Sequence, residues 1–462
     1  MKNRVTVLTS LPQEHCLVLA VIDRLLENDV SFRGFLDNRI PDRFSPEYLE
    51  SEVILLDRGV FEKMSPEEKK MLADYSLKHV VVCYDYCGDK ENRTLCNFDT
   101  EITVNGALSK ADIGRGEVPE QDPEVMCRFA RERAEAYLDS DGIGFSEFTL
   151  HHLRALSMGK ELVLRVLPKL FDSQDPEFIP QNHDVLGAWC YAPLCSRLTG
   201  DEKYNKKFLH ILDRTMAARP YSPEGIMGGA GDVSDPLSFR GPHPLWGAHC
   251  AGREKVIYNE MFHFHGPVFA AAALASGDRR YLDHAMKLMR YLRDHNTDPA
   301  DGLPCHYSCA GRRHGAKWSR GIAHILHGIA LMFEVWPDLP EAEAKELAAF
   351  ADSIGDGLLR TQSPGGLWHN IADEEKSPLE TSGTMAFVAA YRALTKARLL
   401  SEDKYGDMIR KGRHGLLRRC YRGGFAGNCS GTGFSPNMDY YFRRPFNFLF
   451  TGQIVPALEG DC

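Results

Sequence analysis

The chain has 462 residues, of which 43% are hydrophobic and 26% charged, a composition typical of a globular protein large enough for two domains. Its formal net charge of -9 argues against nucleic acid or an anionic membrane as a partner, because both select clustered Lys and Arg. The first residues, Met1 to Val5, begin no secretory signal pattern, and no apolar run of about 18 residues follows, so we expect a cytoplasmic protein.

The cysteine pattern favours reduced thiols. Thirteen cysteines, an odd number, are scattered along the chain without the spacing of a disulfide framework. Cys305, His306, Cys309 and His314 lie close together, but they lack the second paired set that a structural zinc site requires. No glycine-rich phosphate loop follows the first expected strand. We therefore expect neither a metal nor a cofactor.

Strands alternate with helices in the first part of the chain. The expected strands are 5–8, 53–56 and 80–83, and the expected helices are 13–27 and 65–76. Alternation at this spacing predicts a small α/β domain with a parallel sheet over residues 1–115.

The remainder, residues 116–462, is helical by its 3.6-residue periodicity. The expected helices are 123–139, 145–171, 184–199, 202–218, 259–275, 278–295, 318–336, 341–361, 380–399, 402–420 and 445–458. One turn recurs between them, from Thr199 to Tyr204 and from Ser276 to Tyr281, with a shorter form at Ser401. Repeated helical hairpins predict a closed ring of stacked pairs, because one hairpin cannot bury its own apolar face.

Polar and aromatic clusters lie at the starts of several expected helices. They are His183-Asp184, Asn259-Glu260, Trp318-Ser319-Arg320-Gly321 and Glu380-Thr381-Ser382. Arg320 is a candidate for binding an anion, because it lies beside an aromatic plane in the first turn of an otherwise apolar helix. Each cluster also has a structural interpretation: Asp184 could cap a helix, Glu260 could be a solvated charge, and Arg320 could pair with a carbonyl group.

The order of these clusters resembles that of the unsaturated glucuronyl hydrolases and the unsaturated rhamnogalacturonyl hydrolases, glycoside hydrolase families 88 and 105. Trp318-Ser319-Arg320-Gly321 matches the Trp-Ser-Arg-Gly of the first family. His183-Asp184 followed by Gly187 is similar to its His-Asp-x-Gly, with one extra residue between. Glu380 to Thr384 matches the Glu-Thr-Ser-Gly-Thr of the second family. The resemblance implies a mainly α fold, an (α/α)6 barrel preceded by the small α/β domain.

The same resemblance assigns roles to residues. It makes Asp184 and Glu260 the acid/base pair that protonates C4 of a 4,5-unsaturated uronic acid and draws water onto C5; a register shifted by one places Asn259 at the second position. His183 and Arg320 would orient the uronate, and His324 stands where the family has an aromatic residue. The other candidates for substrate binding are Trp189, Asn259, His306, Trp318, Glu380, Thr381, Ser382, Tyr441 and Arg443.

The N-terminal domain loosely resembles the glutamine-amidotransferase-like domains attached to some sugar hydrolases, on the basis of Gly59-Val60 followed by Ser65-Pro66-Glu67-Glu68. No Gly-x-Cys-x-Gly elbow surrounds Cys83 or Cys87. We therefore expect this domain to be a scaffold or an interface, and an exposed sheet edge could build a homo-oligomer.

The predicted function is hydrolysis of oligosaccharides that carry an unsaturated uronic acid at the non-reducing end. Two alternatives stay open. The families that this chain resembles usually have an aspartate where it has Glu260 and an aromatic residue where it has His324. Because of these departures, the barrel could hydrolyse a saturated β-glucuronide with a pair of carboxylates. It could also have lost catalysis and act as a carbohydrate-binding module.

Overall fold

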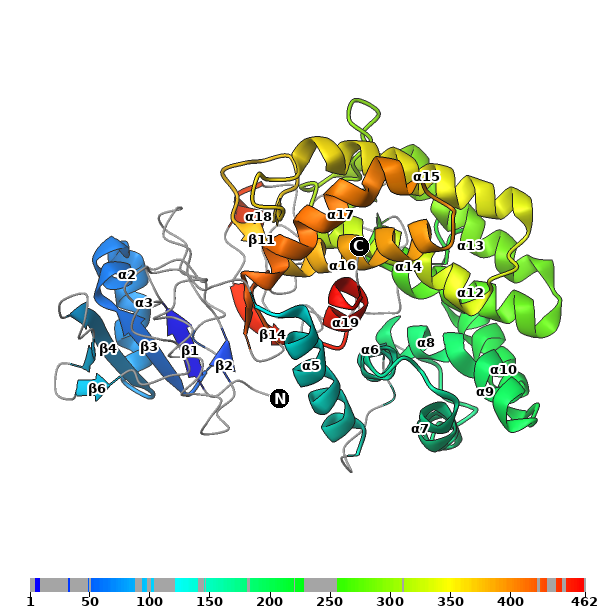
Figure 1. Cartoon of the computed structure of the whole chain (residues 1–462), viewed down its shortest axis with the longest axis horizontal. Helices are drawn as coiled ribbons and strands as arrows, with labels where there is room; N and C mark the ends of the chain where they lie inside the picture. The colour runs from blue at the N-terminus through cyan, green and yellow to red at the C-terminus, as the bar shows by residue number, and fades with distance from the viewer. Residues whose placement is uncertain are drawn as a thin grey trace.

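The computed structural model describes residues 5–8, 32–33, 49, 51–87, 94–97, 101–103, 121–139, 145, 147–180, 183–219, 221–227, 256–309, 311–421, 424–429, 438–442 and 446–460. Figure 1 shows a small α/β part, drawn in blue, beside a larger helical part that runs from cyan to red. The predicted fold, an (α/α)6 barrel preceded by a small α/β domain, is confirmed.

The N-terminal part is built on one six-stranded sheet. Its strands, in spatial order, are β2 (Phe32–Arg33), β1 (Val5–Leu8), β3 (Val53–Asp57), β4 (Val80–Cys87), β5 (Thr94–Asn97) and β6 (Glu101–Thr103). The first four strands pair in parallel, as predicted, whereas β4, β5 and β6 pair antiparallel. The antiparallel edge was not predicted, because β5 and β6 are too short and polar to stand out in the sequence.

Two described helices connect β3 to β4. They are α2 (Arg58–Lys63) and α3 (Pro66–Ser76). The helix α3 begins with a capping box, in which the Ser65 hydroxyl accepts from the Glu68 amide and the Glu68 carboxylate accepts from the Ser65 amide. The expected helix 13–27 and the predicted boundary at residue 115 lie outside the described residues, so both stay predictions.

The described helical part consists of paired inner and outer helices. The outer helices are α5 (Pro123–Leu138), α7 (Lys160–Asp172), α10 (Lys203–Ala218), α13 (Arg279–Tyr291, continued by the π-helical η4, Leu292–Asn296), α15 (Glu341–Thr361) and α17 (Glu402–Leu417). The inner helices are α6 (Glu147–Ala155), α8 (His183–Gly187) with η2 (Ala188–Tyr191) and α9 (Ala192–Thr199), α12 (Glu260–Ser276), α14 (Ser319–Val335), α16 (Thr381–Lys396) and α19 (Ile454–Leu458). The ring closes because α19 packs against both α16 and α6.

Burial explains which helices are inner. In α12 the residues from Met261 to Ala273 are all buried, whereas α13 is amphipathic and turns its arginines outward. The helices α12 and α14 approach closely at Gly328, where a Cβ would lie 2.8 Å from the Phe262 carbonyl oxygen. No helix in the described ranges is long and apolar enough to cross a membrane.

The recurring turn predicted from the sequence leads from an inner helix to the next outer helix. Its tyrosine lies near the start of that outer helix and donates a hydrogen bond to an aspartate on the preceding outer helix. The pairs are Tyr204 with Asp172 (3.4 Å), Tyr281 with Asp213 (2.6 Å) and Tyr405 with Asp352 (2.7 Å). The left-handed residues Gly200 and Gly277 end the inner helices before two of these turns.

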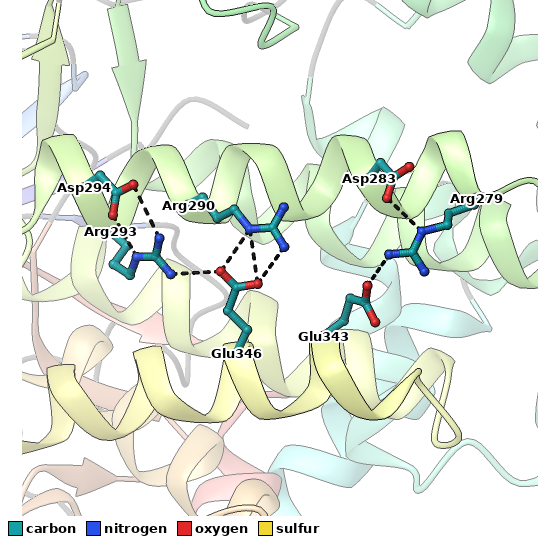
Figure 2. Close-up of polar contacts among 7 residues, drawn as sticks. All are labelled: Arg279, Asp283, Arg290, Arg293, Asp294, Glu343 and Glu346. Atoms are coloured by element: carbon teal, nitrogen blue, oxygen red, sulfur yellow. Dashed lines mark hydrogen bonds and ion pairs between the residues drawn. The ribbon is translucent and has the colours of Figure 1, made fainter.

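Between α13 and α15 the outer ring is joined by ion pairs (Figure 2). Arg290 donates to both oxygens of Glu346, and Arg293 donates to the same carboxylate at 2.8 Å. Arg279 pairs with Glu343, which lies about one turn of α15 before Glu346. Solvent reaches all three arginines, although Glu343 is buried and Glu346 is half-buried, so we expect each pair to contribute only about 0–1 kcal/mol to folding.

The two ends of the barrel differ in the length of their connections. The connections from inner to outer helices are short, such as 200–202 and 277–278. The connections from outer to inner helices are long, and they hold every described strand after residue 121: β7 (Val256–Tyr258), β8 (Tyr307–Cys309), β9 (Arg312–His314), β10 (Trp368–His369), β11 (Leu379–Glu380), β12 (Cys420–Tyr421), β13 (Gly424–Cys429) and β14 (Phe446–Phe450). A rigid scaffold with long loops at one end indicates where a site lies.

Two predicted helices need correction. The expected helix 145–171 is divided into α6 and α7, because Ser157 and Met158 adopt left-handed backbone angles that end α6. The expected helix 445–458 is the strand β14 followed by the short α19, since β14 pairs antiparallel with β13. The short strands in the connections that lead into the inner helices were also not predicted.

Candidate active site

The N-terminal ends of three inner helices hold predicted site residues. Glu260 is the first residue of α12, Trp318 is the N-cap of α14, and Glu380 is the N-cap of α16. All three helices are entered by long, strand-containing connections at the same end of the barrel. The structure therefore brings these clusters to one end of the barrel, while their chemical roles stay a prediction.

A buried chain of hydrogen bonds begins at Glu260. Its Oε1 lies 2.9 Å from His306 Nε2, and His306 Nδ1 lies 2.8 Å from the hydroxyl of Tyr441, which belongs to α18 (Met438–Phe442). Both His306 and Tyr441 have no exposed surface, whereas the Glu260 side chain is 15% exposed. The Glu260 Oε2 atom is buried and accepts no hydrogen bond from the described residues.

The imidazole of His306 is held in a tight pocket. Its ring centre lies 4.9 Å from that of Trp318. A Cβ at Gly321 would lie 3.0 Å from the Trp318 ring and 3.4 Å from His306, and one at Gly315 would lie 2.5 Å from the Tyr441 hydroxyl oxygen. Glycine at these two positions therefore leaves the space that the three rings occupy.

Asn370 connects the two aromatic residues around His306. Its Oδ1 accepts a hydrogen bond from Trp318 Nε1 at 3.0 Å, and its Nδ2 donates to the Tyr441 carbonyl at 3.0 Å. Asn370 was not predicted as a site residue. A lone asparagine after a tryptophan carries no motif, so its contact across the fold left no local signal.

Arg320 lies against the Trp318 ring, 4.7 Å from its centre. Its Nη1 donates to the Ser382 hydroxyl at 3.1 Å and to the Cys429 carbonyl. Arg320 is half-buried. Among the described residues, Nε and Nη2 donate to no partner, so the Nε–Nη2 edge of the guanidinium is available for a bound anion.

Glu380 is a fully buried carboxylate with structural partners. It accepts from the amides of Ser382 and Gly383, from the Ser382 hydroxyl, and from the Cys429 amide at 3.0 Å. It thus caps α16 and anchors β13 to that helix. The neighbouring Thr381 is buried, and its hydroxyl has no hydrogen-bond partner in the described part of the chain.

For two predicted substrate contacts the structure gives a correction. Trp189 is 1% exposed and stacks on Phe171 and Phe208 in the core, so it offers no face to a sugar. Asn259 is fully buried, donates to the Cys305 carbonyl and accepts from Asn296, both at 3.0 Å. Its amide fixes the loop before β8, and the adjacent Glu260 is the residue that faces His306.

Several histidines lie one to two turns below this end. The His324 ring meets the His263 ring edge-on at 4.8 Å, and His263 Nδ1 lies 3.2 Å from His327 Nδ1. Burial holds the pKa of His327 well below its usual range, and the neighbouring His263, Arg154 and His151 lower it further. At neutral pH His327 is therefore uncharged.

Three predicted residues lie partly or wholly outside the described residues. His183 and Asp184 begin α8, which packs against α12, but their side chains are not among those described. Arg443 falls outside the described ranges altogether.

The structure also shows how the cysteine and histidine groups near the site are used. No described group of three His, Cys, Asp or Glu residues has the geometry of a metal site. Both ring nitrogens of His306 face other partners, namely Glu260 and Tyr441. The cysteines that the structure describes with their side chains are free thiols.

The fold is shared with solved glycoside hydrolases at low sequence identity. A possible member of the GH105 family from Klebsiella pneumoniae has a TM-score of 0.59 and 16% identity, over 77% of this chain and 93% of that chain. A family 105 glycoside hydrolase from C. acetobutylicum has a TM-score of 0.56 and 15% identity, over 73% and 97%. The unsaturated glucuronyl hydrolase of Bacillus sp. GL1, responsible for degradation of glycosaminoglycan, has a TM-score of 0.51 and 15% identity, over 72% and 93%.

The sequence itself settles the family. Residues 160–450 match the model of Glycosyl Hydrolase Family 88, a match that spans more than half of the chain and includes Glu260, Arg320 and Glu380. The chain therefore belongs to glycosyl hydrolase family 88 and is a glycoside hydrolase. No curated protein matches it in sequence.

Proposed function

We propose that this enzyme releases a 4,5-unsaturated uronic acid from the non-reducing end of an oligosaccharide. The observation that carries the proposal is the state of Glu260. One carboxylate oxygen is held by His306, and the other is buried, without a partner in the described structure, at the barrel end that holds Arg320. Family membership and the likeness to an unsaturated glucuronyl hydrolase support the substrate class.

The reaction needs a proton at C4 and a water at C5. In our proposal Glu260 donates the proton from Oε2 to C4, and the positive charge that develops at C5 and the ring oxygen is quenched by water. The water loses a proton to a carboxylate and leaves a hydroxyl on C5. The resulting hemiketal opens at the bond between C5 and the ring oxygen: the C5 hydroxyl proton passes to that oxygen, C5 becomes a ketone and C1 becomes a hemiacetal. The hemiacetal then breaks down to an aldehyde at C1, which releases the neighbouring sugar with its own hydroxyl.

Arg320 supplies the affinity for the uronate in this proposal. Its free Nε–Nη2 edge matches the geometry of a carboxylate. The Trp318 ring behind it and the Ser382 hydroxyl beside it hold the guanidinium in place. Asp184 is the second proposed carboxylate; it belongs to the first turn of α8, a helix that packs against α12.

The decisive experiment follows the ultraviolet absorbance of the conjugated double bond in lyase-generated disaccharides. Wild type should abolish the band, and Glu260→Gln and Asp184→Asn should each slow its loss by about 100-fold or more, the typical contribution of a general acid or base. Glu334→Gln is a control, because this carboxylate lies at the other end of α14. If both site variants keep wild-type turnover, the assignment is wrong.

The same assay separates the alternatives. Release of a chromophore from a saturated aryl β-glucuronide, without loss of the double-bond band, would identify ordinary glucuronidase chemistry; the substitution of His324 for a family aromatic is the observation that favours it. Binding of oligosaccharide without turnover of either substrate would identify a binding module.

We also propose, as predicted from the sequence, a cytoplasmic location and assembly into a homo-oligomer through the N-terminal sheet. The short edge strand β2 lies at one end of the sheet order and near β14 of the barrel. Cell fractionation tests the location, and the mass of the intact particle in solution tests the assembly.

A further inference from the structure

The hydrogen bonds that link Glu260, His306 and Tyr441 can be donated in either of two directions. A neutral imidazole carries one N–H and one lone pair, so His306 either donates to Glu260 and accepts from Tyr441, or the reverse. A phenol can donate or accept. The tautomer of His306 does matter for the Glu260 carboxyl group, because a carboxyl proton occupies only one of the two oxygens.

We propose that Tyr441 determines which oxygen of Glu260 carries the catalytic proton. The Tyr441 hydroxyl donates to His306 Nδ1, which keeps the proton of the imidazole on Nε2. The Nε2–H then donates to Glu260 Oε1. With Oε1 engaged as an acceptor, the carboxyl proton resides on Oε2, the oxygen that accepts nothing from the described protein. Tyr441 and His306 are thus positioning residues, and this inference rests on the proposed role of Glu260 as the acid.

The opposite tautomer of His306 would keep the Glu260 proton away from the substrate. If His306 carried its proton on Nδ1, its Nε2 lone pair would accept the Glu260 proton on Oε1. That proton would then lie between two protein atoms 2.9 Å apart rather than at the substrate. A hydrogen bond that fixes the tautomer of His306 therefore raises the fraction of Glu260 that carries its proton on Oε2.

Neighbouring residues fix the position of Tyr441 beside His306. Asn370 binds its main-chain carbonyl, and Gly315 leaves open the space where a Cβ would lie 2.5 Å from the phenol oxygen. The His306 main chain is fixed as well, because its amide donates to the Ala316 carbonyl at 2.9 Å and its carbonyl accepts from the Asn259 amide at 3.2 Å. The three side chains come from separate parts of the sequence, which meet only in the folded barrel.

The first test is Tyr441→Phe, which removes one hydroxyl and keeps the ring. We expect kcat on the unsaturated disaccharide to fall about 10-fold or more, while KM changes less than about 2-fold. A fall of this size in kcat is part of the rate enhancement that a general acid usually contributes. Tyr391→Phe is the matched control: it also removes a buried phenol hydroxyl, one that donates to the Ala351 carbonyl at 2.8 Å away from the site. Equal kcat values for the two variants would overturn the proposal.

A double-mutant cycle distinguishes positioning from simple loss of packing. The amide of His306→Gln can donate to Oε1 but has no tautomer to fix. Tyr441→Phe should therefore cost clearly less in the His306→Gln background than in wild type. If the two effects multiply instead, Tyr441 acts independently of His306 and the proposal fails.

A spectroscopic measurement covers the case in which Tyr441→Phe does not fold. The nitrogen-15 signals of His306 in the native enzyme, identified by their loss in His306→Gln, should show a protonated Nε2 and an unprotonated Nδ1. The reverse pattern overturns the proposal. Failure of the proposed function looks different: Glu260→Gln would then keep full turnover, whatever the tautomer of His306.

Discussion

Arg320 on α14 donates a hydrogen bond from Nη1 to the hydroxyl of Ser382 on α16, across 3.1 Å. The Ser382 hydroxyl donates in turn to the Glu380 carboxylate. The side chain proposed to bind the uronate is therefore oriented by the start of the next inner helix. Affinity for an anionic sugar should depend on residues that need not touch it.

Ser382→Ala tests this dependence. Loss of one charge-assisted hydrogen bond should let the guanidinium rotate away from its position, so we expect KM for the unsaturated disaccharide to rise about 5- to 10-fold with kcat nearly unchanged. Ser401→Ala, which removes a cap from the outer helix α17, should lower stability by about 1 kcal/mol without altering KM. Steady-state kinetics of both variants decide the matter, and equal KM values would contradict it.

Glu380→Gln should have a larger, mainly structural effect. The amide keeps one acceptor oxygen but turns an NH2 group toward backbone amides that also donate. We expect the free energy of unfolding in urea to fall by about 2–3 kcal/mol, since buried donors lose a charged acceptor. The KM of Glu380→Gln for the unsaturated disaccharide should also rise, as we expect for Ser382→Ala. A stable variant with wild-type KM would show that Arg320 is oriented by other contacts.

The sequence could predict the parts of this site that are local. Arg320, Trp318 and Glu380 each lie within one turn of a helix start, so a short motif and the helical periodicity were enough to place them. Asn370 and the pairing of Glu260 with His306 depend on segments far apart in the chain, and no single-sequence pattern encodes such contacts.

The two corrected contacts show the same limit. Trp189 and Asn259 have side chains that suit a sugar site equally well in isolation. Their contacts separate them from it: Trp189 stacks on core aromatic rings, and the Asn259 amide binds the loop before β8. A tryptophan among aromatic neighbours and an asparagine that satisfies a loop are common structural roles. The short strands before the inner helices were missed for a related reason: two or three residues leave no period to detect.

Gly321→Ala should damage the site through close packing. The added methyl would lie 3.0 Å from the Trp318 ring and 3.4 Å from His306, both of which are held by other contacts. We expect kcat/KM to fall about 10-fold and stability to fall by about 1–3 kcal/mol, the usual cost of overpacking. Gly406→Ala is the control, because its methyl would meet only flexible side chains and alanine favours the interior of α17. If Gly321→Ala matches this control, the ring pocket is less tight than the structure indicates.

The outer helix α13 carries a histidine that should make folding sensitive to acid. His284 is 9% exposed and packs on the Phe269 ring at 4.4 Å. Burial, with a smaller effect from Lys287, lowers its pKa from 6.5 to about 4. Between these values the unfolded chain binds a proton that the folded chain does not, so stability falls as the pH falls from about 6.5 to about 4.

His284→Phe should remove this part of the acid sensitivity. We expect the loss in unfolding free energy between pH 7 and pH 4 to be smaller than in wild type by up to about 3 kcal/mol, from about 1.4 kcal/mol for each unit of pKa shift. His152, with its pKa lowered to about 4 by burial, should keep the variant partly sensitive. His210→Gln, at a side chain that is 49% exposed, should leave the wild-type dependence almost unchanged. Urea unfolding at a series of pH values measures the difference, and parallel curves for His284→Phe and wild type would show that His284 titrates alike in the folded and unfolded chain.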